Sequence, residues 1–212
     1  MVGIAKDKRM INDLTQVHTT RRWLSRLAYW VSQIGSPPVT GAVTALMIGF
    51  ILSTPSAWFW TFFYIALTIL IPCAYIVWLV HVGKVVDFHL PARAQRIRPL
   101  MLSLATALVT WLVMFQGQAP ALLQMLATVN VVQMALFLLI TLRWKISLHC
   151  TATTILAELA FVLFGTSAIF LTMSIPLIAW SRVHLERHTV AQTVAGILLG
   201  IGILTPALFM YQ

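Results

Sequence analysis

The stretch CTATTILAELAFVLFGTSAIFLTMSIPLIAW, Cys150 to Trp180, decides how often this chain can cross a membrane. It is apolar apart from one carboxylate and several hydroxyl side chains. Its length suits either one long tilted helix or two short ones. Gly165, which is followed by a threonine and a serine, is typical of a turn. We therefore predict two short spans, 150–164 and 167–180, with a turn at the FGTS segment.

The composition of the whole chain indicates an integral membrane protein. Of the 212 residues, 60% are hydrophobic and only 9% are charged. A soluble fold of this size needs more polar surface than that.

The two cysteines are too few for a disulfide framework and stand in or beside apolar runs. We expect no cleavable signal peptide, since the N-terminal segment is polar and basic.

The predicted fold is an all-α polytopic membrane bundle. Before the first span, the segment TTRRWLSRLAYWVSQIG places Trp23, Leu27 and Trp30 at helical spacing after basic residues. This pattern predicts an amphipathic helix on the membrane surface. The chain is thus divided into a basic N-terminal segment, 1–36, and one transmembrane domain, 37–212. About seven spans are predicted, near 39–53, 58–80, 100–115, 119–142, 150–164, 167–180 and 189–211.

The basic residues are confined to the N-terminal segment and to three gaps between predicted spans, 81–99, 143–149 and 181–188. With seven spans these regions share one face, whereas six spans would move the last gap to the opposite face. The positive-inside tendency predicts that the basic face is cytoplasmic and the C-terminus outside, in a prokaryotic cytoplasmic membrane. The net charge of +9 lies in short gaps, which favours lipid headgroups or an anionic ligand over nucleic acid.

The third gap has a distinctive spacing. In SRVHLERHTVAQ, a Ser-Arg pair is followed after five residues by a histidine and after three more by Gln192. This pattern resembles the third signature of the type 2 phosphatidic acid phosphatases, membrane relatives of the vanadium haloperoxidases. The resemblance implies that Ser181 and Arg182 bind phosphate and that His188 is the nucleophile. Gln192 stands where the family has an aspartate that orients the histidine, and its amide oxygen can accept the imidazole N–H.

The second gap, RWKISLHCT, resembles the second signature of the same family, in which a serine precedes a histidine by two residues. Ser147 and His149 match that pair. The resemblance implies that His149 protonates the leaving oxygen and later deprotonates the attacking water. It also implies that a core of six helices is an alternative to the seven-span count.

The first gap, KVVDFHLPARAQRIRP, matches the first signature only at Arg98 and Pro99, because Pro91 occupies the place of the family's lysine. A neighbouring cation can supply that charge from elsewhere in the gap. Planar arginine forks suit phosphate oxygens, and cations stabilise a phosphoryl group in transfer. The candidate phosphate ligands in the three gaps, besides the two serines, are Arg93, Arg96, Arg98, Lys145 and Arg182.

Together these features predict metal-independent hydrolysis of a membrane lipid phosphate or diphosphate through a phosphohistidine. No cofactor or metal is expected, because a magnesium–phosphate site needs more carboxylates than these gaps hold. A non-catalytic protein that binds or transports lipid phosphates is the alternative, in which Gln192 marks lost catalysis. The sequence leaves the oligomeric state open.

Three further features of the sequence concern acidic residues and glycines. The two acidic residues each have two interpretations, and the glycine pair has a packing role. Glu158 lies within a predicted span, where an acid is either functional or pairs with another helix. Asp87 either pairs with an arginine of the first gap or is a plain loop residue. Gly196 and Gly200 form a small-xxx-small face, which is typical of helix packing.

Overall fold

The structure of the chain, a computed structural model, describes residues 22–85 and 93–211, with side chains in the second part from residue 95. The regular structure of these residues is entirely helical. The predicted roles of Asp87 and Pro91, the basic residues before Arg22 and the side chain of Arg93 therefore lie outside the described residues.

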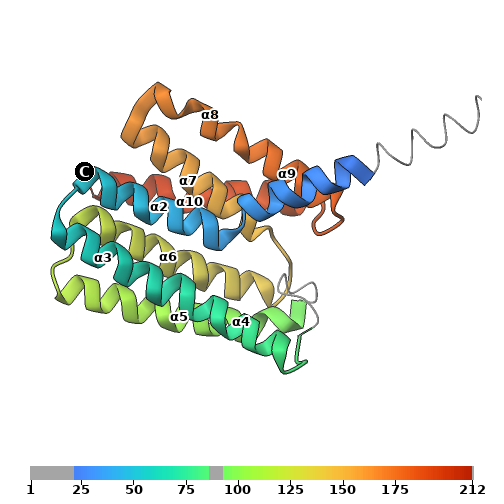
Figure 1. Ribbon diagram of the computed structural model, residues 1–212, viewed down its shortest axis with the longest axis horizontal. Helices are drawn as coiled ribbons and strands as arrows, with labels where there is room; N and C mark the ends of the chain where they lie inside the picture. Colours follow the sequence, from blue (N-terminus) through green and yellow to red (C-terminus); the bar gives the residue numbers. More distant parts are fainter. Residues whose placement is uncertain (1–21, 86–92, 212) are drawn as a thin grey trace, which may run out of the picture.

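Helices account for most of the described chain and pack side by side as a bundle (Figure 1). A first helix, Arg22–Ile34, precedes α2. The others are α2 (Pro37–Leu52), α3 (Pro55–Ile65), the π-helical turn η1 (Ala66–Leu70), α4 (Ile71–His81), α5 (Arg93–Gln116), α6 (Ala121–Thr141), α7 (Leu148–Phe164), the 3₁₀ turn η2 (Gly165–Ala168), α8 (Ile169–Thr172), α9 (Ser174–His184) and α10 (Val190–Met210).

Five helices of the described chain are long and apolar enough to cross a membrane, which indicates an integral membrane protein. A sixth span is reached if Arg22–Ile34 and α2, which meet at an angle of 44°, count as one. The seven predicted spans are therefore not confirmed. The predicted span 39–53 corresponds to α2, which has only 16 residues. The predicted span 167–180 corresponds to two helices, α8 and α9, of 4 and 11 residues.

The predicted turn at FGTS coincides with the end of α7. Helix α7 stops at Phe164, and Gly165 has a φ of 62° and a ψ of −141°, a conformation that suits glycine. The helical run continues through η2 into α8, but α9 packs back against α7 (Figure 1). The chain therefore folds back on itself after α7.

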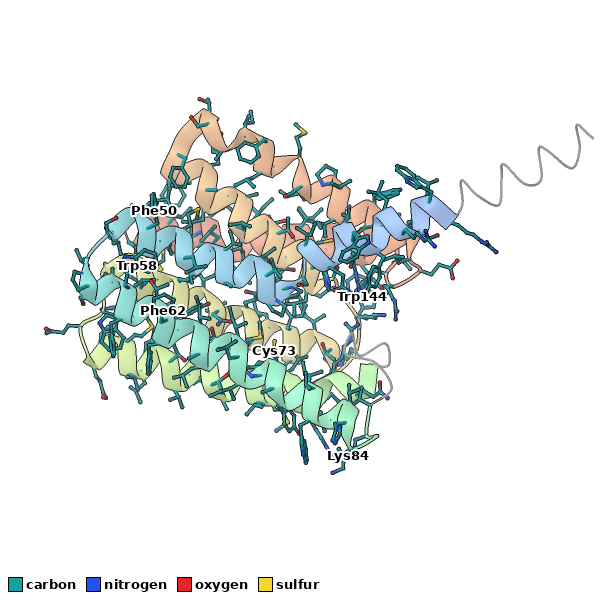
Figure 2. All side chains as sticks on the ribbon, in the orientation of Figure 1. Phe50, Trp58, Phe62, Cys73, Lys84 and Trp144 are labelled. Atoms are coloured by element: carbon teal, nitrogen blue, oxygen red, sulfur yellow. The ribbon has the colours of Figure 1, made fainter. Side chains whose placement is uncertain are left out.

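The three basic gaps meet at one end of the bundle. The end of α4, the start of α5 and the connections after α6 and α9 lie there together with the start of the first helix (Figure 1). The α2–α3 and α5–α6 connections and the end of α10 lie at the opposite end. Figure 2 shows Trp144 and Lys84 at the first end, which we call the basic end, and Phe50 and Trp58 towards the other. Aromatic side chains at both ends of a bundle are typical of membrane interfaces.

The first helix packs against α9 and leaves its tryptophans outside. Ala28 and Ser32 are buried, whereas Trp23 and Trp30 are exposed. At Gly35, just after this helix, an added Cβ would lie 2.0 Å from Ile178 Cδ1 of α9, so this side chain packs closely on the glycine and would have to move for any larger residue. The predicted position of this helix on the membrane surface remains a prediction.

Gly196 and Gly200 allow α10 to approach α7 closely, as the small-residue spacing predicted. A Cβ on Gly196 would lie 2.6 Å from the Ser147 carbonyl oxygen, and one on Gly200 would lie 3.0 Å from the Thr151 carbonyl oxygen. The Thr151 hydroxyl also donates a hydrogen bond to the Gly196 carbonyl at 2.8 Å. This contact holds the N-terminal ends of α7 and α10 together at the basic end.

Glu158 joins the same two helices further along, because the Thr205 hydroxyl of α10 donates a hydrogen bond to its Oε1. Of the two readings from the sequence, this contact favours pairing between helices.

Candidate functional site

One cavity is lined by residues from all three basic gaps. It has a volume of about 260 Å³ and is lined at the basic end by Arg96, His149, Arg182 and His188. These side chains come from the start of α5, the first turn of α7, the last turn of α9 and the loop before α10. The structure therefore brings both predicted catalytic histidines and two predicted phosphate ligands to one place.

His188 stands directly before a capping box that orients its ring. Thr189 caps α10, and its backbone N–H donates to Gln192 Oε1 at 3.2 Å. His188 Nδ1 lies 3.1 Å from the same Oε1. Because the backbone N–H is a donor, the atom it meets is the amide oxygen, which can only accept from His188. Nδ1 therefore carries the proton, and Nε2 keeps its lone pair.

The surroundings of His188 keep the ring neutral. Its side chain is 7% exposed. Burial, followed by the charges of Arg182, Lys145 and Arg96, lowers the pKa of His188 to about 3, against a smaller opposing effect of the Gln192 hydrogen bond. At neutral pH the imidazole is thus an uncharged base or nucleophile.

Arg182 is buried in the last turn of α9, with 3% of its side chain exposed. Its Nη1 donates to the Ser32 hydroxyl of the first helix at 2.6 Å. Its backbone carbonyl accepts from the N–H groups of Arg187 at 3.0 Å and His188 at 3.2 Å. One residue thus presents a guanidinium to the cavity and fixes the loop that carries His188. The contribution of Ser32 has no signal in the sequence patterns.

His149 is the second residue of α7 and is 9% exposed. The free N–H groups and the dipole of a helix N-terminus favour an anion at this position. Lys145, in the loop before α7, donates to the Arg187 carbonyl at 2.8 Å. It does not line the cavity, yet burial and then the charges of Arg96, Arg182 and Arg187 lower its pKa. Lys145 therefore belongs to the same cluster of positive charge.

The two serines that the sequence assigned to phosphate binding do not line the cavity. Ser147 is fully buried as the N-cap of α7 and accepts from the Cys150 N–H at 3.3 Å. Ser181 is also fully buried, and its hydroxyl donates to the Ile178 carbonyl at 2.8 Å. Both hydroxyls are hydrogen-bonded within their own helices, so the structure does not bring them to the cavity, and their contact with phosphate stays a prediction.

Arg98 is exposed and does not line the cavity, in contrast to Arg96. The two residues stand two positions apart on α5, and such positions point to different sides of a helix. The structure therefore brings Arg96 to the cavity and not Arg98, whose phosphate contact stays a prediction. Arg93 begins α5, and its side chain lies outside the described residues.

The cavity continues from the basic end into the interior of the bundle. Most of its walls are apolar side chains of α4, α5 and α6, such as Pro72, Leu100 and Phe137. A second set of polar side chains, Asn130, Gln133 and Tyr64, lines it farther from the basic end. We call these three residues the inner polar group. Sequence reasoning missed it, although two amides three residues apart in an apolar run are a signal of a polar helix face.

Within the described ranges, no group of three or more His, Cys, Asp or Glu residues is arranged to hold a metal ion. No family model matches the chain, and neither the curated proteins nor the solved structures include a match. The inference about function therefore rests on the geometry of the site and its chemistry.

Proposed function

We propose that this protein hydrolyses a membrane lipid phosphate or diphosphate without a metal, through a phosphohistidine at His188. The supporting observation is that His149, Arg182 and His188, from separate parts of the sequence, line one cavity whose other walls are apolar. Cationic side chains suit the phosphate oxygens, and apolar walls suit the hydrocarbon part of a lipid.

The proposed reaction has two steps. In the first, the Nε2 lone pair of neutral His188 attacks phosphorus, the bond to the lipid oxygen breaks, and protonated His149 gives that oxygen a proton. In the second, neutral His149 takes a proton from water, which attacks phosphorus and breaks the P–N bond. Inorganic phosphate leaves, and both histidines return to their starting states. Arg182 and Arg96 stabilise the charge on the equatorial oxygens.

The proposed arrangement in the membrane follows from the distribution of charge. With seven passes, the basic end faces the cytoplasm of a prokaryotic cell and the C-terminus lies outside. Each basic residue near anionic lipid stabilises this orientation by about 1 kcal/mol. A cytoplasmic site suits the processing of newly made lipid. The first helix would then lie at the same interface.

The second candidate is a protein that binds or transports lipid phosphates without hydrolysis. The observation that favours it is Gln192, since a neutral amide stabilises the imidazolium that forms on His188 less than a carboxylate would. Both candidates predict binding of lipid phosphates in the cavity, and only the first predicts release of phosphate.

The test is phosphate release from a panel of lipid phosphates by the purified protein. We expect His188→Ala and His149→Ala to lower turnover by roughly 10²- to 10⁴-fold, the usual contribution of one positioned acid–base group. The matched control is His184→Ala, because His184 stacks on Trp180 and does not line the cavity. EDTA should leave the rate unchanged. A near-native rate in His188→Ala would refute the hydrolase, and binding without release would support the second candidate.

A further inference from the structure

The inner polar group lies well inside the membrane-spanning part of the bundle. Thr141, at the basic end of α6, and Asn130 line the same cavity and stand eleven residues apart. That separation corresponds to about 16 Å along the helix. Gln133 lies between them on the same face, and Tyr64 of α3 stands opposite, next to Asn130 and Thr68.

Among the three residues of the inner polar group, Gln133 gives the strongest evidence for a bound ligand. It is only 7% exposed, and it lines both the main cavity and a smaller one of about 40 Å³ beside it. Within the ranges 22–85 and 95–211, its amide atoms are not among the enclosed polar atoms that lack a hydrogen bond, so they are open to the cavities that the residue lines. An amide that meets hydrocarbon there without a partner costs free energy. A ligand that forms a hydrogen bond with the Gln133 amide would remove this cost.

The chemistry of the occupant follows from this need. A polyprenyl chain has no atom that can hydrogen-bond, so its presence would leave the amide of Gln133 in contact with hydrocarbon, whereas Asn130 keeps its side-chain hydrogen bond with Tyr64. An acyl ester has a carbonyl oxygen that accepts from an amide N–H or from the Tyr64 hydroxyl. The two lipid classes therefore differ in whether they satisfy the inner polar group.

We infer that the inner polar group is a specificity site for the acyl ester part of a glycerol-based lipid phosphate. This inference rests on the proposed function only for the position of the phosphate at the basic end. It narrows the substrate to acyl glycerol phosphates and sets polyprenyl phosphates aside. Sites built to hydrogen-bond a substrate discriminate strongly against analogues that lack the group, because their own polar atoms then lose a partner.

Cys73 provides a readout that does not depend on turnover. It lines the cavity, is partly buried, and lies on α4 in the middle of the bundle (Figure 2). Cys150, the other cysteine, is fully buried. In a Cys150→Ala protein, the rate of alkylation of Cys73 by a maleimide therefore reports whether a lipid occupies the cavity.

The experiment compares protection of Cys73 by diacylglycerol phosphate, dialkylglycerol phosphate and a polyprenyl monophosphate in mixed micelles. We expect the diacyl lipid to protect at concentrations roughly 3- to 10-fold lower than the dialkyl lipid, the effect of one net hydrogen bond, and lower still than the polyprenyl lipid. Gln133→Leu should abolish this preference and leave protection by the polyprenyl lipid intact, which shows that the variant is folded. Thr128→Val, on α6 outside the cavity, should keep the preference.

Two results would overturn the inference: equal protection by ester and polyprenyl lipids in the unmodified cavity, or an unchanged preference in Gln133→Leu. Phosphate release is measured in parallel. If no lipid is hydrolysed but the ester preference depends on Gln133, the inference stands and the proposed hydrolysis fails. If hydrolysis occurs without any ester preference, the proposed function stands and the inference fails.

Discussion

At the scale of single residues, His188 and Arg182 have different parts in the site. His188 presents a neutral ring that Gln192 orients, and Arg182 presents a guanidinium to the same cavity. The spacing of the Ser-Arg pair, the histidine and Gln192 in the sequence sufficed to select both side chains and the amide that orients the ring. It did not show that the serines would turn to their own helices, because a motif gives the order of residues and not the direction of their hydroxyls. The spacing also did not predict that Ser32, which is 150 positions away in the sequence, accepts a hydrogen bond from Arg182.

Arg182→Lys should lower kcat/KM for a lipid phosphate by at least roughly tenfold. An ammonium cannot reproduce the planar fork that meets two phosphate oxygens, and the hydrogen bond to Ser32 would be lost as well. Arg98→Lys is the matched control, since Arg98 is exposed away from the cavity. The measurement is phosphate release under subsaturating substrate. Equal rates for the two variants would argue against direct contact between Arg182 and phosphate.

His188 should remain neutral in the folded protein at pH 5, because burial and nearby cations hold its pKa at about 3. The unfolded chain takes up a proton on this residue below a pH of about 6.5. Stability should therefore fall as the pH drops from about 6.5 towards 3, by up to about 2 kcal/mol at pH 5. Nitrogen NMR of labelled histidine, with His188→Asn to assign the signal, measures the ionisation directly. A protonated ring at pH 5 would contradict the description of the site.

At the scale of helices, the patterns of apolar residues located the long helices well, since each apolar run is bounded by charges or by Gly and Pro. They failed where helices are short or irregular. The π-helical turn η1 ends at Leu70, two residues before Pro72, which lacks the N–H of a regular α-helical bond. The broken stretch from η2 to α9 depends on packing against α7, which no local pattern reports.

Gly196→Ala should weaken the protein and reduce activity. The added methyl group would lie 2.6 Å from the Ser147 carbonyl oxygen, so α7 and α10 must separate at the end that carries His149 and His188. Overpacking of this kind typically costs about 1–3 kcal/mol. Gly202→Ala, in the same helix, meets no atom within 4 Å and is the control. The midpoint of thermal unfolding in detergent and phosphate release should both fall only in Gly196→Ala.

At the scale of the whole molecule, the charge count predicted that the three gaps would share one face, and their described residues do lie together at the basic end (Figure 1). The cavity between them could not be foreseen, because it depends on how α4, α5 and α6 diverge around Pro72, Leu100 and Phe137. The side of the membrane on which this end lies is a separate question, since the bundle itself has the same packing in either orientation.

Cysteine labelling in intact cells tests the orientation. In a Cys73→Ser, Cys150→Ala background, Trp144→Cys places a thiol at the basic end (Figure 2) and Thr166→Cys places one in η2. If the basic end is cytoplasmic, an impermeant maleimide should label only the cysteine at 166, and a permeant one should label both. Labelling of the cysteine at 144 from outside would reverse the proposed topology.

The central claim is that His188 carries the phosphoryl group during turnover, and rapid quenching with a lipid labelled in its phosphate tests it most directly. We predict that the label becomes bound to the protein within one turnover, that the bond is stable in alkali and labile in acid, and that it maps to His188 by mass spectrometry. His188→Asn should take up no label, and His184→Asn should behave like the unmodified protein. Release of phosphate with no label on His188, or with label on another residue, would contradict the account.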